Sequence, residues 1–182
     1  MSFYATAETA LENAAYAEPS EGDKEAVTES NSYVTIIEKV ERTLPLVTDD
    51  ADLIPDGVEA ELLARCEKIA EEYEMEVAIH TTYDFGGLIA EAYADDYYDF
   101  NGYGYGENDD GFIVVFNTGE GDGNRNIAIS THGKGVDLLT DMEIDVIIEM
   151  MINPIKNGDF AGAFDNFVAE CENAVDTGVS LL

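Results

Sequence analysis

Five aspartates beside the ends of predicted elements are the residues of this sequence best suited to chemistry. In an open α/β sheet, loops that meet at one edge bring ligand-binding side chains together. Carboxylate oxygens are the ligands that Ca²⁺ and Mg²⁺ prefer. We therefore expect a site for one of these divalent cations, formed by Asp49, Asp50, Asp109, Asp110 and Asp141.

Each of these aspartates also has a purely structural interpretation. Asp141 falls in the first turn of a predicted helix, where a negative charge interacts favourably with the helix dipole. Asp109 and Asp110 precede Gly111, and this combination is typical of a turn. Asp49 and Asp50 can cap the element that follows them. Both interpretations stay open for every one of these residues.

The two histidines have different settings. His80 falls within a predicted strand, which favours a structural histidine. His132 follows a strand and precedes a glycine-rich loop, so it is the better candidate for a catalytic residue. Neither is accompanied by a serine or cysteine in a recognisable nucleophile setting, so the sequence predicts no hydrolase triad.

The charge of the chain limits its partners. Forty acidic residues face eight basic ones, which gives a formal net charge of -32. We expect no binding to nucleic acid, because phosphates would be repelled, and we expect cations to be the natural partners. No apolar stretch is long enough to cross a membrane, and no signal peptide opens the chain. We therefore expect no direct membrane contact by this segment.

Apolar periodicity defines the predicted fold. Residues 1–32 read as an appendage or linker, and residues 33–182 as the folded domain. We predict strands at 33–37, 75–82, 112–116 and 127–130, and helices at 58–73 and 88–99, from Thr140 to a stop at Pro154, and after Gly158. Strands that alternate with helices predict an α/β fold, a three-layer α/β/α sandwich with a mixed, mostly parallel central sheet.

The two cysteines, Cys66 and Cys171, lie on the apolar faces of two predicted helices. This placement favours buried packing residues. A disulfide between them stays open as an alternative.

Five segments, in order, resemble the TPM domain family. They are Val47–Ile54, Ala90–Tyr98, Asp110–Val114, Ile129–Asp141 and Pro154–Phe164. The resemblance spans roughly residues 45 to 175 and implies an α/β/α sandwich. It also implies divalent-cation binding, an association with acid phosphatase activity or photosystem II repair, and display outside the cytoplasm. Many relatives carry a signal and a membrane anchor, so we expect this chain to be the extracytoplasmic soluble domain of a membrane-anchored protein.

Two functions follow as expectations. In the first, a cation held by Asp50, Asp110 and Asp141 polarises a phosphoryl group and activates water. Arg125 then orients the phosphate, with His132 as a second choice. In the second, the domain is a non-catalytic Ca²⁺-binding module that contacts another protein through the tyrosine-rich segment 97–105. The scarcity of basic residues favours the second, because phosphate substrates need cationic partners.

Overall fold

Four strands and five α-helices make up the part of the chain that the computed structural model describes, residues 40–120 and 124–178. In chain order these are β1 (Val47–Asp49), α1 (Asp56–Tyr73), β2 (Glu76–Thr82), α2 (Ala90–Phe100), a short 3-10 helix (Gly106–Asn108), β3 (Gly111–Asn117), β4 (Ile127–His132), α3 (Gly135–Leu138), α4 (Asp141–Lys156) and α5 (Phe160–Thr177). The predicted strand 33–37 and the predicted appendage 1–32 lie outside the described residues.

The sheet has the order β1-β2-β3-β4. β1 and β2 are parallel, β2 and β3 are parallel, and β4 runs antiparallel to β3. The prediction of a mixed, mostly parallel sheet is therefore confirmed. We call the edge where β1, β2 and β3 end and β4 begins the carboxyl edge. The opposite edge, where β2 and β3 begin and β4 ends, is the amino edge.

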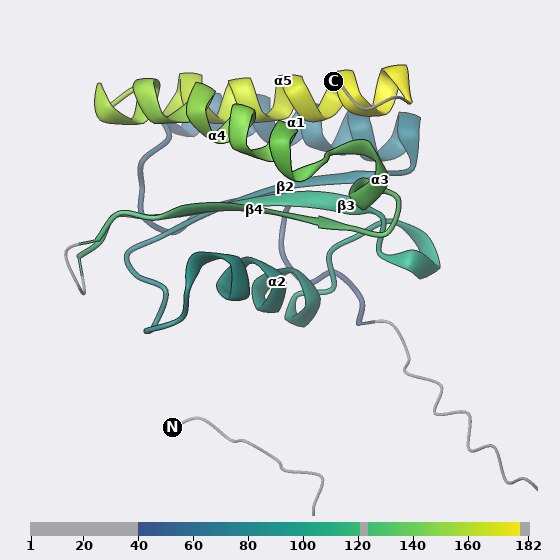
Figure 1. The fold of residues 1–182 in the computed structure, drawn as a ribbon, viewed down its shortest axis with the longest axis horizontal. Coiled ribbons are helices and arrows are strands. Elements are labelled where there is room, and N and C mark those ends of the chain that lie inside the picture. The colour runs from purple at the N-terminus through teal and green to yellow at the C-terminus, as the bar shows by residue number, and fades with distance from the viewer. Residues whose placement is uncertain (1–39, 121–123, 179–182) are drawn as a thin grey trace, which may run out of the picture. The chain divides into compact units, whose positions relative to one another are not determined.

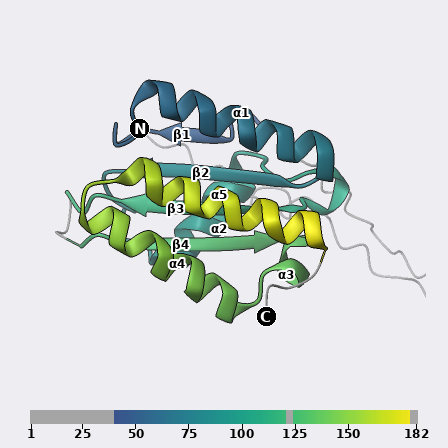
Figure 2. The same ribbon diagram turned by 90° about the horizontal axis from the view of Figure 1, so that it is seen from above.

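Helices cover both faces of this sheet. α1, α4 and α5 lie on one face and α2 lies on the other, which confirms the three-layer sandwich (Figure 1). α5 lies between α1 and α4 when this layer is seen from above (Figure 2). All seven residues of β3 are buried, as expected of a central strand that is covered on both faces.

The two ends of α4 show how local sequence sets a helix. The predicted capping box is present, and the Thr140 N–H donates to Glu143 Oε2 at 2.7 Å. The prediction that α4 stops at Pro154 is wrong, because the helix continues to Lys156. Proline has no N–H to donate to the carbonyl four residues earlier. The Asn166 side chain of α5 replaces that donor and binds the Met150 oxygen at 3.3 Å.

The cysteines are packing residues. Cys66 on α1 and Cys171 on α5 are free thiols with no exposed surface. Burial raises the pKa of the Cys66 thiol to about 12, and burial also raises the pKa of the Cys171 thiol. Both thiols therefore stay protonated and unreactive in the folded domain.

Part of the tyrosine-rich segment 97–105 belongs to the core. Tyr98 and Tyr103 are fully buried, and the Tyr103 hydroxyl donates to the Pro45 oxygen at 2.8 Å. Tyr105 keeps 38% of its surface exposed. The expected contact surface therefore excludes Tyr98 and Tyr103, because their rings pack in the core, whereas Phe100, with 76% of its surface exposed, remains on the outside with Tyr105.

No helix in the described part of the chain is both long and apolar enough to cross a membrane.

Candidate functional site

The predicted site residues divide between the two edges of the sheet. Asp49 and Asp50 end or follow β1, whereas Asp109 and Asp110 precede β3. In the β2–β3 pair, Glu76 lies opposite Gly111 at one end and Thr82 opposite Asn117 at the other. A seven-residue strand is roughly 20 Å long at about 3.3 Å per residue. Asp50 and Asp110 therefore cannot share one cation, and the three-carboxylate mechanism is wrong.

The sequence already indicates that these two pairs of aspartates lie apart. One pair of aspartates follows a strand and the other precedes a strand. Where strands are parallel, those positions are at opposite edges of the sheet.

At the amino edge, Asp110 is buried and forms hydrogen bonds with two other segments of the chain. Only 3% of its surface is exposed. Its Oδ1 accepts the Lys134 N–H at 2.8 Å, and its Oδ2 lies 3.0 Å from Lys134 Nζ. Its backbone pairs with Tyr105 in both directions. Asp110 thus fixes the turn after β4 to the start of β3, and its carboxylate oxygens are already engaged.

Asp109 occupies the turn beside it with a left-handed backbone, φ 54°. The Asp109 carbonyl accepts the Tyr98 hydroxyl at 3.0 Å. This residue therefore has the turn role that its sequence setting allowed.

His132 lies on the side of the sheet covered by α2. Its ring stacks on Tyr98 with centroids 3.8 Å apart. Nε2 is 2.9 Å from Ser130 Oγ, which in turn donates to Asp95 Oδ1 at 2.5 Å. Nδ1 lies 3.9 Å from Asp99 Oδ1. Burial lowers the pKa of His132, and the nearby aspartates partly oppose that shift.

Ser130 was missed by sequence reasoning, although it lies two residues before His132. Alternate residues of a strand share a face, so this spacing was the available signal. The Ser130 hydroxyl donates to Asp95, and its oxygen faces His132. The Ser130 hydroxyl therefore links β4, which carries His132, to α2, which carries Asp95.

Asp141 begins α4 and is exposed, as a first-turn aspartate is expected to be. Arg125 is exposed and precedes β4, so it belongs to the carboxyl edge, whereas His132 and Asp110 belong to the amino edge. The predicted catalytic set Asp110, Arg125 and His132 is therefore not brought together.

At the carboxyl edge, Asp49 organises the loop that leads into α1. Its Oδ2 accepts the Ile54 N–H at 2.6 Å, and its Oδ1 accepts a short hydrogen bond from the Thr81 hydroxyl. Thr81 Oγ1 accepts the Ala51 N–H at 3.3 Å. Both carboxylate oxygens of Asp49 are thus committed to the protein, which favours a structural role.

Asp50 is exposed, and its charge acts on the buried or half-buried aromatic groups His80, Tyr93 and Tyr97. His80 is 1% exposed, with Nδ1 2.9 Å from Thr48 Oγ1 and Nε2 3.0 Å from the Tyr93 hydroxyl. It stacks on Tyr97 at 3.8 Å. Burial lowers the pKa of His80 to about 4, although Asp50 acts in the opposite direction. This buried, fully hydrogen-bonded ring agrees with the predicted structural role of His80.

A second exposed carboxylate, Asp84, belongs to the same edge and was missed. Burial is the main cause that raises the pKa of Tyr93, and the charges of Asp50 and Asp84 both add to it. Asp84 Oδ1 accepts the Gly86 N–H at 2.6 Å. Asp84 could have been predicted as a site residue, because it follows β2 just as Asp50 follows β1.

A pocket of about 240 Å³ opens beside Asp84. It is lined by Asp84, Phe85, Gly86, Gly87, Leu88, Asn117 and Asn126. Asn117 is buried, and its Oδ1 accepts the Asn126 N–H at 2.7 Å. Within residues 40–120 and 124–178, no three His, Cys, Asp or Glu side chains are grouped so that they could hold a metal ion. A cation at this edge would therefore need backbone carbonyls, amide oxygens or water as further ligands.

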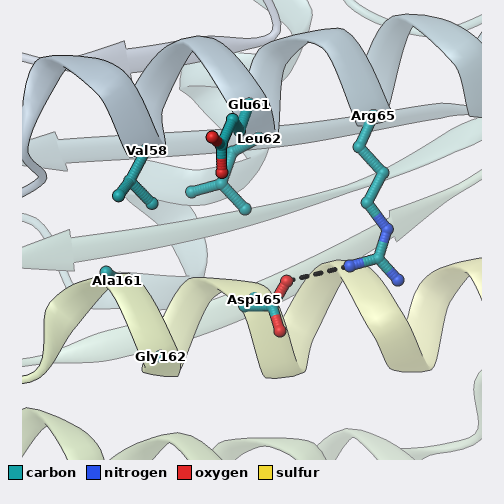
Figure 3. Close-up of a pocket in the computed structure, with 7 residues that line it drawn as sticks. All are labelled: Val58, Glu61, Leu62, Arg65, Ala161, Gly162 and Asp165. Atoms are coloured by element: carbon teal, nitrogen blue, oxygen red, sulfur yellow. Dashed lines mark hydrogen bonds and ion pairs between the residues drawn. The ribbon is translucent and has the colours of Figure 1, made fainter.

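A cleft of about 400 Å³ lies elsewhere, between α1 and α5 (Figure 3). Its one cationic side chain is Arg65, whose Nη1 lies 2.9 Å from Asp165 Oδ1. The same guanidinium donates to Glu172 at 2.6 and 2.8 Å. Two carboxylates thus already neutralise this arginine, so the cleft offers little attraction for a phosphate.

The fold is shared with solved structures of bacterial proteins. The N-terminal domain of a protein from P. gingivalis has a TM-score of 0.61 and 23% identity, over 74% of this chain and 84% of that one. The N-terminal domain of cg2496 from Corynebacterium glutamicum has a TM-score of 0.51 and 16% identity, over 86% and 88% of the two chains. BA42 from the psychrophilic bacterium Bizionia argentinensis has a TM-score of 0.52 and 16% identity, over 71% and 86%. At these identities the likeness establishes the fold alone.

No curated protein sequence matches this chain. The family model of the TPM domain, in contrast, matches residues 47–174. That match covers most of the chain and every helix and strand from β1 to α5, apart from the last turn of α5. It agrees with the five segments noted in the sequence, and the chain therefore belongs to the TPM domain family.

Proposed function

We propose that the carboxyl edge of this TPM domain binds a divalent cation, with Asp50 and Asp84 as its carboxylate ligands. One observation carries this proposal. Asp50 follows β1 and Asp84 follows β2, and these two strands are parallel neighbours in the sheet. Both carboxylates are exposed and lie at the edge where ligands of open α/β sheets gather.

Calcium is the ion that suits this arrangement best. Ca²⁺ accepts six to eight oxygen ligands in flexible geometry, including backbone and amide carbonyls and water. Two exposed carboxylates with several waters correspond to weak binding, on the order of 10⁻⁴ to 10⁻³ M, as in extracellular modules. This affinity fits the extracytoplasmic location that we propose from the family resemblance. Mg²⁺ is the alternative ion.

Catalysis is the second candidate function. Arg125 at the same edge favours it, because a guanidinium can bind a phosphate ester beside a cation. The cation would polarise the phosphoryl group and activate water. Against this, the opposite edge holds His132 and Asp110, so neither is available as an acid or base here. We therefore propose a binding module first and a metal-assisted phosphatase second.

A calcium titration tests the proposal. Isothermal titration of the parent chain should show weak binding, and the melting temperature should rise with Ca²⁺. Asp50→Asn and Asp84→Asn should each weaken binding at least tenfold. Asp137→Asn removes an equal charge from an exposed position in α3 and should leave binding unchanged. If all three variants reduced calcium affinity equally, the ion would be attracted only by the overall negative charge, and the proposed site would be wrong.

Hydrolysis of p-nitrophenyl phosphate separates the two functions. Calcium binding without turnover in any divalent ion establishes the binding module and removes the phosphatase. Turnover that is lost in both Asp50→Asn and Arg125→Met establishes the enzyme.

A further inference from the structure

We infer that the outward surface of α4 is a docking site for a basic amphipathic helix of another protein. This α4 surface consists of an apolar row and the acidic row beside it: Met142, Val146 and Met150, with Asp141, Asp145 and Glu149. It is independent of the carboxyl-edge site, and it gives the protein partner expected from the sequence a defined location and chemistry.

α4 carries more apolar surface than its own fold uses. Nine of its sixteen residues are Met, Ile or Val, yet only Ile147, Met151 and Ile155 among them are buried. Met142, Val146 and Met150 keep 65%, 46% and 39% of their surfaces exposed. α5, in the same layer, has no large apolar side chain that is exposed. A helix that is apolar around most of its circumference is normally covered on more than one side.

The exposed row has the dimensions of a helix-binding surface. Positions four apart lie on one face of a helix, one turn above another. From Met142 to Met150 the row rises about 12 Å at 1.5 Å per residue. Two of its three members are methionines, whose flexible side chains adapt to the anchors of a partner helix. Helices dock on such surfaces through apolar residues at similar spacing.

The neighbouring charges select the partner. Asp141, Asp145 and Glu149 each precede one member of the apolar row, and all three are exposed. α4 has no Lys or Arg before Lys156. A partner segment with Lys or Arg beside its apolar face would complement both rows.

The same charges argue against this chain as its own partner. The net charge is -32, so a second copy would be repelled. Residues 1–39 carry eight acidic and two basic residues, so that segment has the same sign as the α4 surface. A cationic segment from a different protein is the occupant that these charges favour.

A pair of synthetic peptides tests the inference. The probe is a Leu/Lys peptide with helical amphipathic spacing, and its control has the same composition in an order that spreads leucine around the helix. Fluorescence anisotropy near physiological salt should show at least tenfold tighter binding of the amphipathic peptide. The triple variant Met142→Gln, Val146→Gln, Met150→Gln keeps every charge and should lose that preference. Ile89→Gln with Phe100→Gln, which alters two other exposed apolar residues, should retain it.

The acidic row is tested separately. Asp145→Asn with Glu149→Gln should weaken binding of the amphipathic peptide severalfold and reduce its dependence on salt. Glu71→Gln with Asp137→Asn removes two exposed charges elsewhere and should have a clearly smaller effect. Thermal unfolding checks that each variant is folded, and Val146→Gln alone replaces the triple variant if that one is not.

Several results would overturn the inference. Equal binding of both peptides would show general charge attraction. Equal loss in the Ile89 and Phe100 control would remove the role of α4. Binding to phosphatidylcholine vesicles that needs the apolar row would point to a membrane instead. A dimer in sedimentation experiments that the triple variant abolishes would point to a second copy of this chain.

Discussion

Lys134 engages both carboxylate oxygens of Asp110, one through its backbone N–H at 2.8 Å and the other through its ammonium group at 3.0 Å. The aspartate is almost fully buried, whereas 61% of the lysine side chain is exposed. The backbone contact is therefore the stronger structural tie, because an exposed ion pair contributes little. The relationship explains why an aspartate precedes the central strand without any need for a metal.

Removing the Asp110 carboxylate should destabilise the domain. Asp110→Ala leaves the Lys134 N–H without its partner, and we expect a loss of about 1–3 kcal/mol in urea unfolding. Asp110→Asn keeps an acceptor oxygen and should cost about 1 kcal/mol or less. Calcium affinity should stay the same in both. A variant that keeps its stability and loses calcium binding would identify Asp110 as a ligand instead.

Gly133 should tolerate no side chain. Its φ is +53°, and a Cβ there would collide with Asp110 Oδ1 and with the Asn108 carbonyl. We expect Gly133→Ala to cost more than about 2 kcal/mol of unfolding free energy. Gly158 is the matched control, because its φ is +77° but the space around it is open. Gly158→Ala should cost only about 1–2 kcal/mol, and similar losses for the two variants would contradict the packing at Gly133.

His80 should make the domain less stable in mild acid. Its pKa is lowered to about 4 in the folded state by burial, whereas the unfolded chain titrates near 6.5. Between those values the unfolded state binds a proton that the folded state does not. Stability is therefore lost as the pH falls from about 6.5 to 4, by roughly 3 kcal/mol from this group.

The His80 prediction is checked by the pH dependence of urea unfolding in the parent and in His80→Gln, since the difference isolates this residue from the many carboxylates. NMR titration should also leave the His80 imidazole neutral at pH 5.5. A midpoint near 6.5 in the folded protein would contradict the burial of the ring.

The two cysteines should react only when the domain opens. Burial raises the pKa of both thiols, so the thiolate is scarce and inaccessible. We expect almost no reaction with Ellman's reagent under native conditions and two equivalents of thiol in guanidinium chloride. Fast native reaction of either thiol would contradict the packing of α1 against α5, and no thiol in denaturant would reveal a disulfide.

The elements were predictable from sequence because their signals are local. The apolar stripe of α1 and the continuous apolar run of β3 each reflect contacts with one core. Thr140 and Glu143 likewise set the start of α4 by themselves. The predicted stop at Pro154 was wrong because the Asn166 side chain, in the next helix, supplies the hydrogen bond to the Met150 carbonyl that proline cannot donate. No local pattern contains that contact.

The site was less predictable because its residues come from several loops. Asp50 and Asp84 follow successive parallel strands, and that shared position can be read from the sequence once the sheet is known. Asp110 was a candidate because it precedes the most apolar strand. Its carboxylate instead accepts the Lys134 N–H in the turn at the amino edge. Residue type alone does not distinguish a carboxylate that binds a ligand from one that accepts a backbone N–H.

The stacking of each histidine on a tyrosine also gives the domain an optical reporter. The chain has no tryptophan, so its ultraviolet emission comes from tyrosine alone. Tyr97 and Tyr98 are consecutive, yet they contact different imidazoles, those of His80 and His132, each at 3.8 Å between ring centroids. Protonation of an imidazole changes the emission of a phenol ring in contact with it. Because the chain has ten tyrosines, the loss of an emission change in Tyr97→Phe or in Tyr98→Phe would assign that change to His80 or to His132 without a label.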